Sequence, residues 1–326
     1  MVNDIKASKR NNIFIKVLLI PEIGILIPLV ILILLFYSLN NIFLSFLNIA
    51  NVLRSLSYYG IIGVGMTICL VAGEVDISVG SVAGLSAVLC GVLLRDGYPI
   101  PFAIIIGLLV GISIGFINGI ITIKGKIPSL ITTLGMLSIC RGLVSVVTKG
   151  YNVYPFPEGF NNFGKAEPLG ISYSFVIFII IVIIGAIFFN RTIWGRRVFS
   201  VGGNTEAAKL AGINTNWVKI SAFIITSFCA ALSGIILSAR IACAPPTLGL
   251  GWEFKVIAAV VIGGASLGGG IGSIIGAVIG ATIISILDSG MILANVSPYW
   301  QSVVVGCILI LAVGIDTLRR ERIRRI

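Results

Sequence analysis

Apolar runs long enough to cross a bilayer recur along almost the whole of this chain. A transmembrane helix needs about 20 consecutive, mostly apolar residues. Such runs, the eighth of them short, fall near residues 17–39, 52–72, 77–94, 100–123, 127–148, 171–189, 217–239, 252–262, 271–289 and 298–318. Only 11% of the 326 residues are charged and the mean hydropathy is +1.11, which is too apolar for a soluble surface. The sequence therefore predicts an all-α fold: a polytopic membrane helix bundle of about ten transmembrane helices, forming a single domain over residues 1–326.

Basic residues give the chain a net charge of +11, and they gather in four places. These are the N-terminal segment 1–16, the pair Lys124 and Lys126, the loop 190–216 and the tail 319–326. Basic loops stay on the cytoplasmic side of a membrane, and ten spans place all four clusters there. We therefore expect both termini in the cytoplasm, with membrane lipid rather than nucleic acid beside this charge.

The residues needed for most catalytic and metal sites are missing from the sequence. The chain has no histidine, and its six cysteines are scattered without a CxxC pair. Residues 159–166 read GFNNFGKA, which matches G-x-x-x-x-G-K but continues with alanine. A phosphate-binding loop needs Ser or Thr at that point and a preceding strand. We therefore expect no catalytic residue, no metal site, no cofactor in this chain and no ATP hydrolysis by it.

Glycine recurs at every fourth position in two of the apolar runs. The first stripe is Gly107, Gly111, Gly115 and Gly119, and the second is Gly272, Gly276 and Gly280. Such stripes let helix backbones approach each other closely. The stripes serve either packing within one subunit, which we favour, or a dimer interface.

Two carboxylates lie close together in the sequence AGEVDISVGS at residues 72–81. An isolated charge at the centre of a bilayer costs roughly 2.5–3.5 kcal/mol or more, so Glu74 and Asp76 need an explanation. They lie in a turn at the cytoplasmic edge, or at a break between helix segments that lines a water-filled path, or they carry protons. In the second arrangement Asp76, with Ser78 and Ser81, caps the following helix through its free N–H groups.

Four more polar residues interrupt the apolar runs: Asn118, Thr132, Thr133 and Arg141. Each either bonds a neighbouring helix, which is the more common role, or faces the path. Arg141 lies about eight residues, roughly 12 Å along a helix, from the end of its span. It either extends its side chain to that end or faces the interior, where it can bond a hydroxylated solute. Together with Glu74, Asp76, Ser78 and Ser81, these four are our candidates for the path and its gate.

A short helix is predicted inside the basic loop, over residues 203–212. Asn204 or Thr205 can cap it, Glu206 complements the helix dipole and Gly212 ends it. Alanines keep it slim, which suits either docking into a groove of another protein or an ordinary surface helix. The candidate docking residues are Gly203, Asn204, Thr205, Glu206, Ala207, Ala208, Lys209, Leu210, Ala211 and Gly212.

Three motifs, in this order, carry a family resemblance: GEVDISVGS, GGNTEAAKLAGIN and VIAAVVIGGASLGGGIGSIIGAVIGA at residues 256–281. From about Ala50 to Asp316 the chain resembles the permease subunits of bacterial ABC importers for monosaccharides of the ribose, xylose and arabinose type. The resemblance implies a permease domain in the bacterial cytoplasmic membrane that is not an enzyme and moves a sugar by alternating access. The family more often has Gly where Glu74 stands, so Asp76 is the better candidate for a shared role.

The resemblance also implies partners. These are an ATP-binding subunit that holds ATP and Mg²⁺, a second permease subunit (identical or different) and an extracytoplasmic solute-binding protein. In that family, the residues that match 203–212 look like the loop that contacts the ATP-binding subunit. The alternative from another class is a proton-coupled secondary transporter that uses Glu74 and Asp76 and needs no ATPase. A membrane-embedded enzyme has little support, because no nucleophile–base pair or metal-ligand cluster is present.

Overall fold

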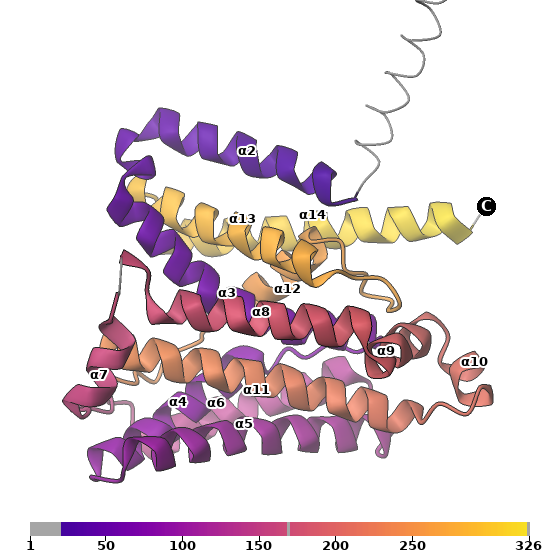
Figure 1. Ribbon diagram of the computed structural model, residues 1–326, viewed down its shortest axis with the longest axis horizontal. Coiled ribbons are helices and arrows are strands. Elements are labelled where there is room, and N and C mark those ends of the chain that lie inside the picture. Colours follow the sequence, from indigo (N-terminus) through magenta and orange to yellow (C-terminus); the bar gives the residue numbers. More distant parts are fainter. Residues whose placement is uncertain (1–20, 168–169, 325–326) are drawn as a thin grey trace, which may run out of the picture.

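The computed structural model describes residues 21–167 and 170–324, and helices dominate these residues (Figure 1). In the described part of the chain, the only β-type pairing is a single bridge between Val153 and Ala244. The predicted all-α fold is confirmed. The helices are α2 (Pro21–Leu39), η1 (Asn41–Leu44), α3 (Phe46–Val71), α4 (Val79–Arg95), α5 (Ile100–Ile123), α6 (Ser129–Thr148), α7 (Glu158–Lys165), α8 (Tyr173–Arg191), α9 (Ile193–Gly203), α10 (Thr205–Leu210), α11 (Thr215–Ile241), α12 (Trp252–Ile262), α13 (Ile274–Leu293) and α14 (Pro298–Arg324).

The polytopic character of the bundle is confirmed too. Among the described residues, seven helices are long and apolar enough to cross a membrane, accompanied by the shorter apolar helix α4 and the stretch Leu26–Leu39. Helix α12 has 11 residues and is therefore only about 16 Å long. The count of about ten spans is approximate for that reason. The basic segment 1–16 and the last two residues of the tail 319–326 lie outside the described residues.

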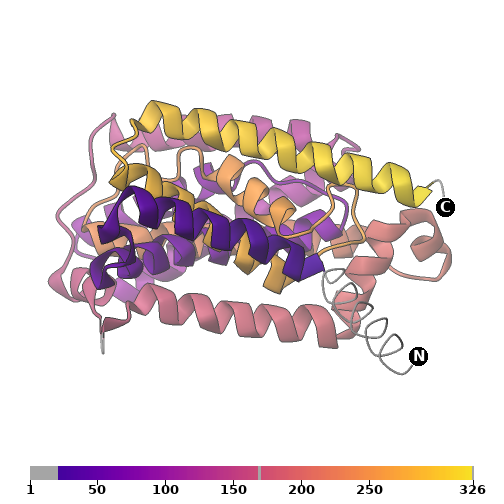
Figure 2. The ribbon, with the colours of Figure 1, turned by 90° about the horizontal axis from the view of Figure 1, so that it is seen from above.

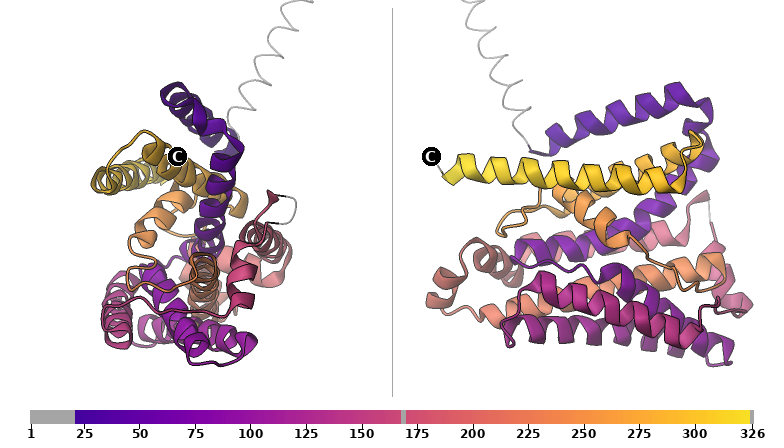
Figure 3. Two further views of the ribbon diagram at one scale, coloured as in Figure 1. Left: turned by 90° about the vertical axis from the view of Figure 1, so that its left-hand side faces the viewer. Right: turned by 180° about the vertical axis from the view of Figure 1, so that it is seen from behind.

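Two long helices organise the bundle. Helix α11 packs against α3, α4 and α5, and α13 packs against α2, α3 and α12, so α3 joins two groups of helices. Figure 3 shows these groups on opposite sides of α3, with α2, α13 and α14 in one and α4, α5 and α6 in the other. Helix α3 is mostly buried, whereas α14, which runs along one side of the molecule in Figure 2, has few buried residues among those described. This exposure is expected of apolar helices that face lipid.

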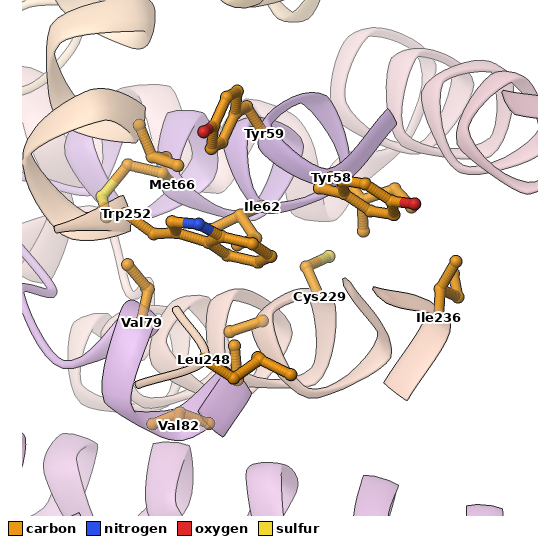
Figure 4. Packing of buried hydrophobic residues seen from close by; sticks show 14 of the residues in the cluster. Tyr58, Tyr59, Ile62, Met66, Val79, Val82, Cys229, Ile236, Leu248 and Trp252 are labelled. Atoms are coloured by element: carbon orange, nitrogen blue, oxygen red, sulfur yellow. The ribbon is translucent and has the colours of Figure 1, made fainter. Parts of the chain in front are cut away.

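Aromatic side chains fill the core where α3 meets α12. Trp252 stacks on Tyr58 at 6.2 Å between ring centroids, and its ring meets Tyr59 edge-on at 5.7 Å (Figure 4). Trp252 is 8% exposed. The first residue of α12 is therefore buried in the bundle, and α12 begins in the interior.

The glycine stripe of α5 packs against α11 of the same subunit. A Cβ atom added at Gly115 would lie 2.6 Å from the Phe223 carbonyl oxygen, and one added at Gly119 would lie 2.9 Å from the Ile220 Cα. Gly111 also faces α11, at the Ser227 carbonyl, whereas Gly107 lies between α4 and the end of the Ile235 side chain. The stripe supports packing within one subunit, the interpretation favoured above.

The second stripe serves a contact between α13 and α12, with one correction to the prediction. Gly276 and Gly280 lie against backbone carbonyls of Gly263 and Ala259. Gly272 is not part of that helix, because α13 begins only at Ile274. A Gly-rich loop over residues 263–273 delays the start of the helix, and the predicted span 271–289 therefore begins too early.

Two non-helical segments interrupt the bundle. Residues 72–78 join α3 to α4, and residues 242–251 join α11 to α12. The second segment lies directly on α4, where Gly80 and Gly84 leave room for the carbonyl groups of Gly249 and Leu248. Irregular backbone at membrane depth is tolerated only where protein or water covers it, and here α4 provides that cover.

Candidate functional site

Asp76 is the centre of a buried hydrogen-bond network between α3 and α4. Its side chain is completely buried. Its Oδ1 accepts hydrogen bonds from the Ser78 amide (2.9 Å) and hydroxyl (2.6 Å), and the Ser227 hydroxyl lies 3.4 Å from Oδ2. Asn118 donates to the Ser78 hydroxyl at 3.0 Å. The network ties segment 72–78 to both α5 and α11.

Residues 72–78 form a short non-helical connection between α3 and α4, which fits both the turn and the break between helix segments considered for Asp76. Ser78 makes no side-chain cap bond to α4, and the Ser81 hydroxyl donates to the Ser78 carbonyl at 2.7 Å. Asp76 therefore holds the residue just before the helix, while the two serines do not cap it with their side chains. A role in a path or gate stays a prediction.

Glu74 forms an ion pair with Lys219 on α11, with 2.9 Å between Oε1 and Nζ. Both residues line a cavity of about 360 Å³. Ser129 of α6, Thr205 of α10 and Lys126 also line it. The cavity therefore opens where segment 72–78, the α5–α6 turn and the 203–212 region meet.

The first turn of α6 holds segment 72–78 from the other side. The Val75 amide donates to the Ser129 hydroxyl at 3.3 Å, and the Thr133 hydroxyl lies 3.4 Å from the Val75 carbonyl. Thr132 is buried, and its hydroxyl has no hydrogen-bond partner in the described part of the chain. Asn118 and Thr133 thus bond neighbouring elements, which is the common role of such residues.

The short helix in the basic loop is present as α10. The Asn204 side chain caps it by accepting from the Ala207 amide at 3.0 Å, and Gly212 after it has φ +80°. Ala208 is buried, whereas Leu210 is 90% exposed. Figure 1 shows α10 at one end of the molecule, opposite α7. We call these the α10 end and the α7 end.

Helix α9, which we did not predict, connects α10 to the bundle through a junction of bare backbone. The Gly270 amide donates to the Val71 carbonyl at 2.9 Å, and a Cβ atom on Gly202 would overlap that carbonyl. Gly202 lies at the end of α9, Val71 at the end of α3 and Gly270 in the loop before α13. We call these three residues the glycine junction.

Arg141 lies apart from the Asp76 network and faces the interior. Its Nη1 donates to the Leu248 carbonyl in segment 242–251 at 2.8 Å. Glu253, on the second residue of α12, is 4% exposed and interacts electrostatically with Arg141. Our sequence reasoning missed Glu253, although an acidic residue in the run GWEFKVIAAVV carries the same cost as Asp76 does.

A partly buried ion pair that our sequence reasoning also missed joins α12 to α13. Lys255 lies 2.6 Å from Asp288, and the Tyr59 hydroxyl of α3 donates to the same carboxylate oxygen at 2.9 Å. The charges at positions 255 and 288 are 33 residues apart, so spacing alone does not reveal the pair. It fixes the short helix α12 between α3 and α13.

The bundle brings most of the predicted path residues together. Six of them surround or belong to one segment: Glu74, Asp76, Ser78, Ser81, Asn118 and Thr133. Arg141 lies two turns beyond Thr133 on α6 and bonds a different segment. Among the described residues, no group of three or more Cys, Asp or Glu side chains could hold a metal ion.

Comparisons with known proteins agree on one class. Residues 48–313 match the family described as the permease component of the branched-chain amino acid transport system. The chain is 37% identical to a ribose import permease protein of Bacillus subtilis, over 90% of this chain and 92% of the relative. It is 34% identical to an L-arabinose ABC transporter permease protein of Azospirillum brasilense, over 86% of this chain and 83% of the relative. A xylose transport system permease protein of Escherichia coli is 33% identical, with 92% and 93% covered. No solved structure matches.

Proposed function

Since this chain belongs to the transport permease family that it matches over residues 48–313, we propose that it is the membrane subunit of an ATP-driven monosaccharide importer. It moves a ribose-like sugar across the bacterial cytoplasmic membrane by alternating access. The chain is a transport subunit, and ATP hydrolysis takes place in a separate ATP-binding subunit that holds ATP and Mg²⁺.

The observation that carries this proposal is the similarity to sugar permeases. Relatives named for ribose, arabinose and xylose are 33–37% identical and cover 86–92% of this chain. All three names denote pentoses, so we propose a pentose or a related small polyol-like sugar as the solute. The helical bundle, with its polar residues gathered in the interior, is compatible with that function.

The α10 end is, in this proposal, the cytoplasmic end. Lys124 and Lys126 lie in the α5–α6 turn, and Arg191, Arg196, Arg197 and Lys209 lie on or between α8 and α10. Basic loops favour the cytoplasmic side. The exposed Leu210 then faces the ATP-binding subunit, and the α7 end receives the solute-binding protein. A second permease subunit completes the complex.

Purification in mild detergent tests the proposal. The tagged chain is isolated from its native cell after crosslinking, and its companions are identified by mass spectrometry. We expect an ATP-binding protein in near-equal amount, and sugar uptake that vanadate stops and a protonophore spares. A chain recovered alone, with uptake that a protonophore abolishes and vanadate spares, would overturn the proposal in favour of a proton-coupled transporter.

A further inference from the structure

We propose that the cavity at the α10 end binds a small phosphorylated sugar from the cytoplasm, and that its occupancy slows import. The inference rests on the proposed function, which places this end in the cytoplasm and makes a sugar the transported solute. The cavity volume of about 360 Å³ lies at the lower end of ligand pockets in proteins, which range from about 300 to 1,000 Å³. It is large enough for a small molecule of this class.

Lysine side chains make the cavity attractive to anions. Lys126 from the α5–α6 turn and Lys219 from α11 line it, together with the carboxylate of Glu74, so two positive charges and one negative charge leave a net charge of +1. Lys126 is exposed and makes no ion pair or hydrogen bond with any described residue. An incoming anion therefore finds a cation that the described part of the chain leaves unpaired.

Two long helices begin at the cavity. Ser129 is the first residue of α6 and Thr215 is the first residue of α11, and both line the cavity. The first amide groups of a helix have no partner within it, and those of Ser129, Thr215 and Asn216 make no hydrogen bond to any other described residue. Helix N-termini bind phosphate through such amides and through the helix dipole. Together with Lys126, these helix ends supply the donors that a phosphate group needs.

Buried hydroxyl groups in the cavity wall also lack partners. Thr215 is 7% exposed, and its hydroxyl makes no hydrogen bond to a described residue. Thr122, which also lines the cavity, is 6% exposed, and its hydroxyl has no hydrogen-bond partner in the described part of the chain. Buried polar groups in proteins are almost always hydrogen-bonded. Two unpaired hydroxyls in one wall therefore indicate a polar occupant.

The carboxylate in the wall favours a phosphorylated sugar over phosphate alone. Glu74 Oε1 is paired with Lys219 at 2.9 Å, and no described residue donates a hydrogen bond to Oε2. A carboxylate oxygen accepts hydrogen bonds from hydroxyl groups and repels a phosphate. A ligand with a phosphate at one end and hydroxyls at the other matches both kinds of group. Phosphorylation is the class of reaction that consumes an imported neutral sugar, and its product carries both.

The walls of the cavity belong to four separate elements. Glu74 lies in the segment between α3 and α4, Ser129 on α6, Thr205 on α10 and Thr215 on α11. A ligand shifts a conformational equilibrium when it binds one conformation better than the other. A ligand that contacts several of these elements binds their present arrangement more tightly than one in which they separate. Its presence therefore opposes the alternation that import requires.

Binding is tested by calorimetric titration of the purified full chain in detergent with D-ribose 5-phosphate, inorganic phosphate and D-ribose. We expect ribose 5-phosphate to bind at least tenfold more tightly than either of the others. Lys126→Gln should weaken its binding about tenfold, the value of one charge-assisted hydrogen bond, and Thr215→Val should weaken it too. The matched control is Lys124→Gln, an exposed lysine in the same turn that does not line the cavity.

The control variant should bind ribose 5-phosphate as the wild type does. Equal affinities of Lys126→Gln and Lys124→Gln would overturn the inference. So would inorganic phosphate that binds as tightly as ribose 5-phosphate, because the sugar would then contribute nothing.

The effect on import is tested in proteoliposomes that contain the complete transporter, with ATP inside. Ribose 5-phosphate inside the vesicles should slow uptake of radiolabelled D-ribose several-fold in the wild type and in Lys124→Gln, and much less in Lys126→Gln. Vesicles of phosphatidylcholine alone are compared with vesicles that also contain phosphatidylglycerol. Inhibition that disappears in the anionic vesicles would show that a lipid headgroup occupies the cavity, which overturns the inference.

Three outcomes separate this inference from the proposed function. If the chain binds ribose 5-phosphate but the complex takes up no monosaccharide, the proposed function fails and the binding site stands. If the complex imports ribose while ribose 5-phosphate neither binds nor inhibits, only the cavity assignment is wrong. If ribose 5-phosphate binds the isolated chain but not the complex, the ATP-binding subunit covers the cavity, and the effect on import is overturned.

Discussion

Asp76 is a buried carboxyl residue whose surroundings contain hydroxyl and amide donors from two parts of the chain. Two donors come from Ser78 beside it, and a third, from Ser227, reaches it across the bundle. Buried carboxylates are tolerated when hydrogen bonds replace their lost hydration. Asp76 therefore fixes the chain where α3 ends and α4 has not yet begun.

Replacing Asp76 should destabilise this connection. In Asp76→Ala the Ser78 amide and hydroxyl lose their acceptor, and each unpaired buried donor costs about 1–3 kcal/mol. We expect a lower melting temperature of the detergent-purified protein, with Asp76→Asn intermediate because one acceptor oxygen remains. Asp96→Asn, at an exposed position, should change stability by less than about 0.5 kcal/mol. Equal melting temperatures for Asp76→Ala and the wild type would contradict this account.

The contribution of the ion pair between Glu74 and Lys219 can be tested by exchanging the two charges. Glu74→Lys places two cations side by side and should reduce ATP-driven uptake several-fold. The double variant Glu74→Lys, Lys219→Glu restores opposite charges in contact, and coupling energies of about 0.5–3 kcal/mol are typical of such neighbours. We expect most of the uptake to return. If the double variant is as poor as the two single changes combined, the pair is not the reason for these residues.

At the scale of helices, α5 and α11 pack closely because glycines leave one face of α5 without side chains. Along their contact Gly111 and Gly115 face the backbone of α11 directly. Close backbone approach is the usual basis of helix association in membranes, where lipid removes the hydrophobic drive between helices. One glycine of the bundle outside this contact offers a control, since a Cβ atom at Gly135 on α6 would meet nothing within 4 Å.

Gly115→Ala and Gly135→Ala should therefore have opposite effects. At Gly115 the new methyl group would lie 2.6 Å from the Phe223 carbonyl and 2.8 Å from the Ile224 Cα, so two helices must separate. Overpacking of this kind costs about 1–3 kcal/mol. At Gly135 alanine should stabilise the helix by roughly 0.5–1 kcal/mol. Thermal unfolding in detergent measures both, and a neutral Gly115→Ala would refute the close-packing explanation.

The sequence predicts helices well here and their contacts poorly, for physical reasons. Hydropathy places α3, α5, α6, α8, α11 and α13 because a bilayer imposes their length. It does not predict α9, which is short and lies in a polar loop. Apolar periodicity also cannot tell that α12 begins inside the bundle, because its first turn carries Glu253 and Lys255, as a helix end at the membrane surface would. The pairings of Glu74 with Lys219 and of Arg141 with Leu248 depend on tertiary packing that one sequence does not encode locally.

At the scale of the whole molecule, α10 is the element that leaves the bundle. Leu210, the last residue of α10, is 90% exposed, whereas Ala208 in the same helix is buried. An exposed leucine beside a capped helix suits burial in a partner's groove. We therefore expect Leu210→Asp and Glu206→Lys to weaken binding of the proposed ATP-binding subunit at least tenfold without lowering the melting temperature of the isolated chain.

Co-purification measures this loss, with Tyr151→Asp at the α7 end as the control. Tyr151 is 77% exposed, so this change too puts an acidic residue at an exposed site, but at the opposite end of the bundle. It should leave the ATP-binding subunit attached. If Leu210→Asp and Glu206→Lys both co-purify with a full complement of that subunit, the docking assignment is wrong.

The glycine junction has a mechanical consequence. Contacts between side chains absorb small displacements by rotating about their χ angles, whereas Gly202, Gly270 and the Val71 carbonyl meet as backbone and have no such freedom. A push on α9 therefore reaches the end of α3, and the loop before α13, with little slack. The link between the exposed α10 and the buried Asp76 segment is thus stiff because it is made of the smallest residue.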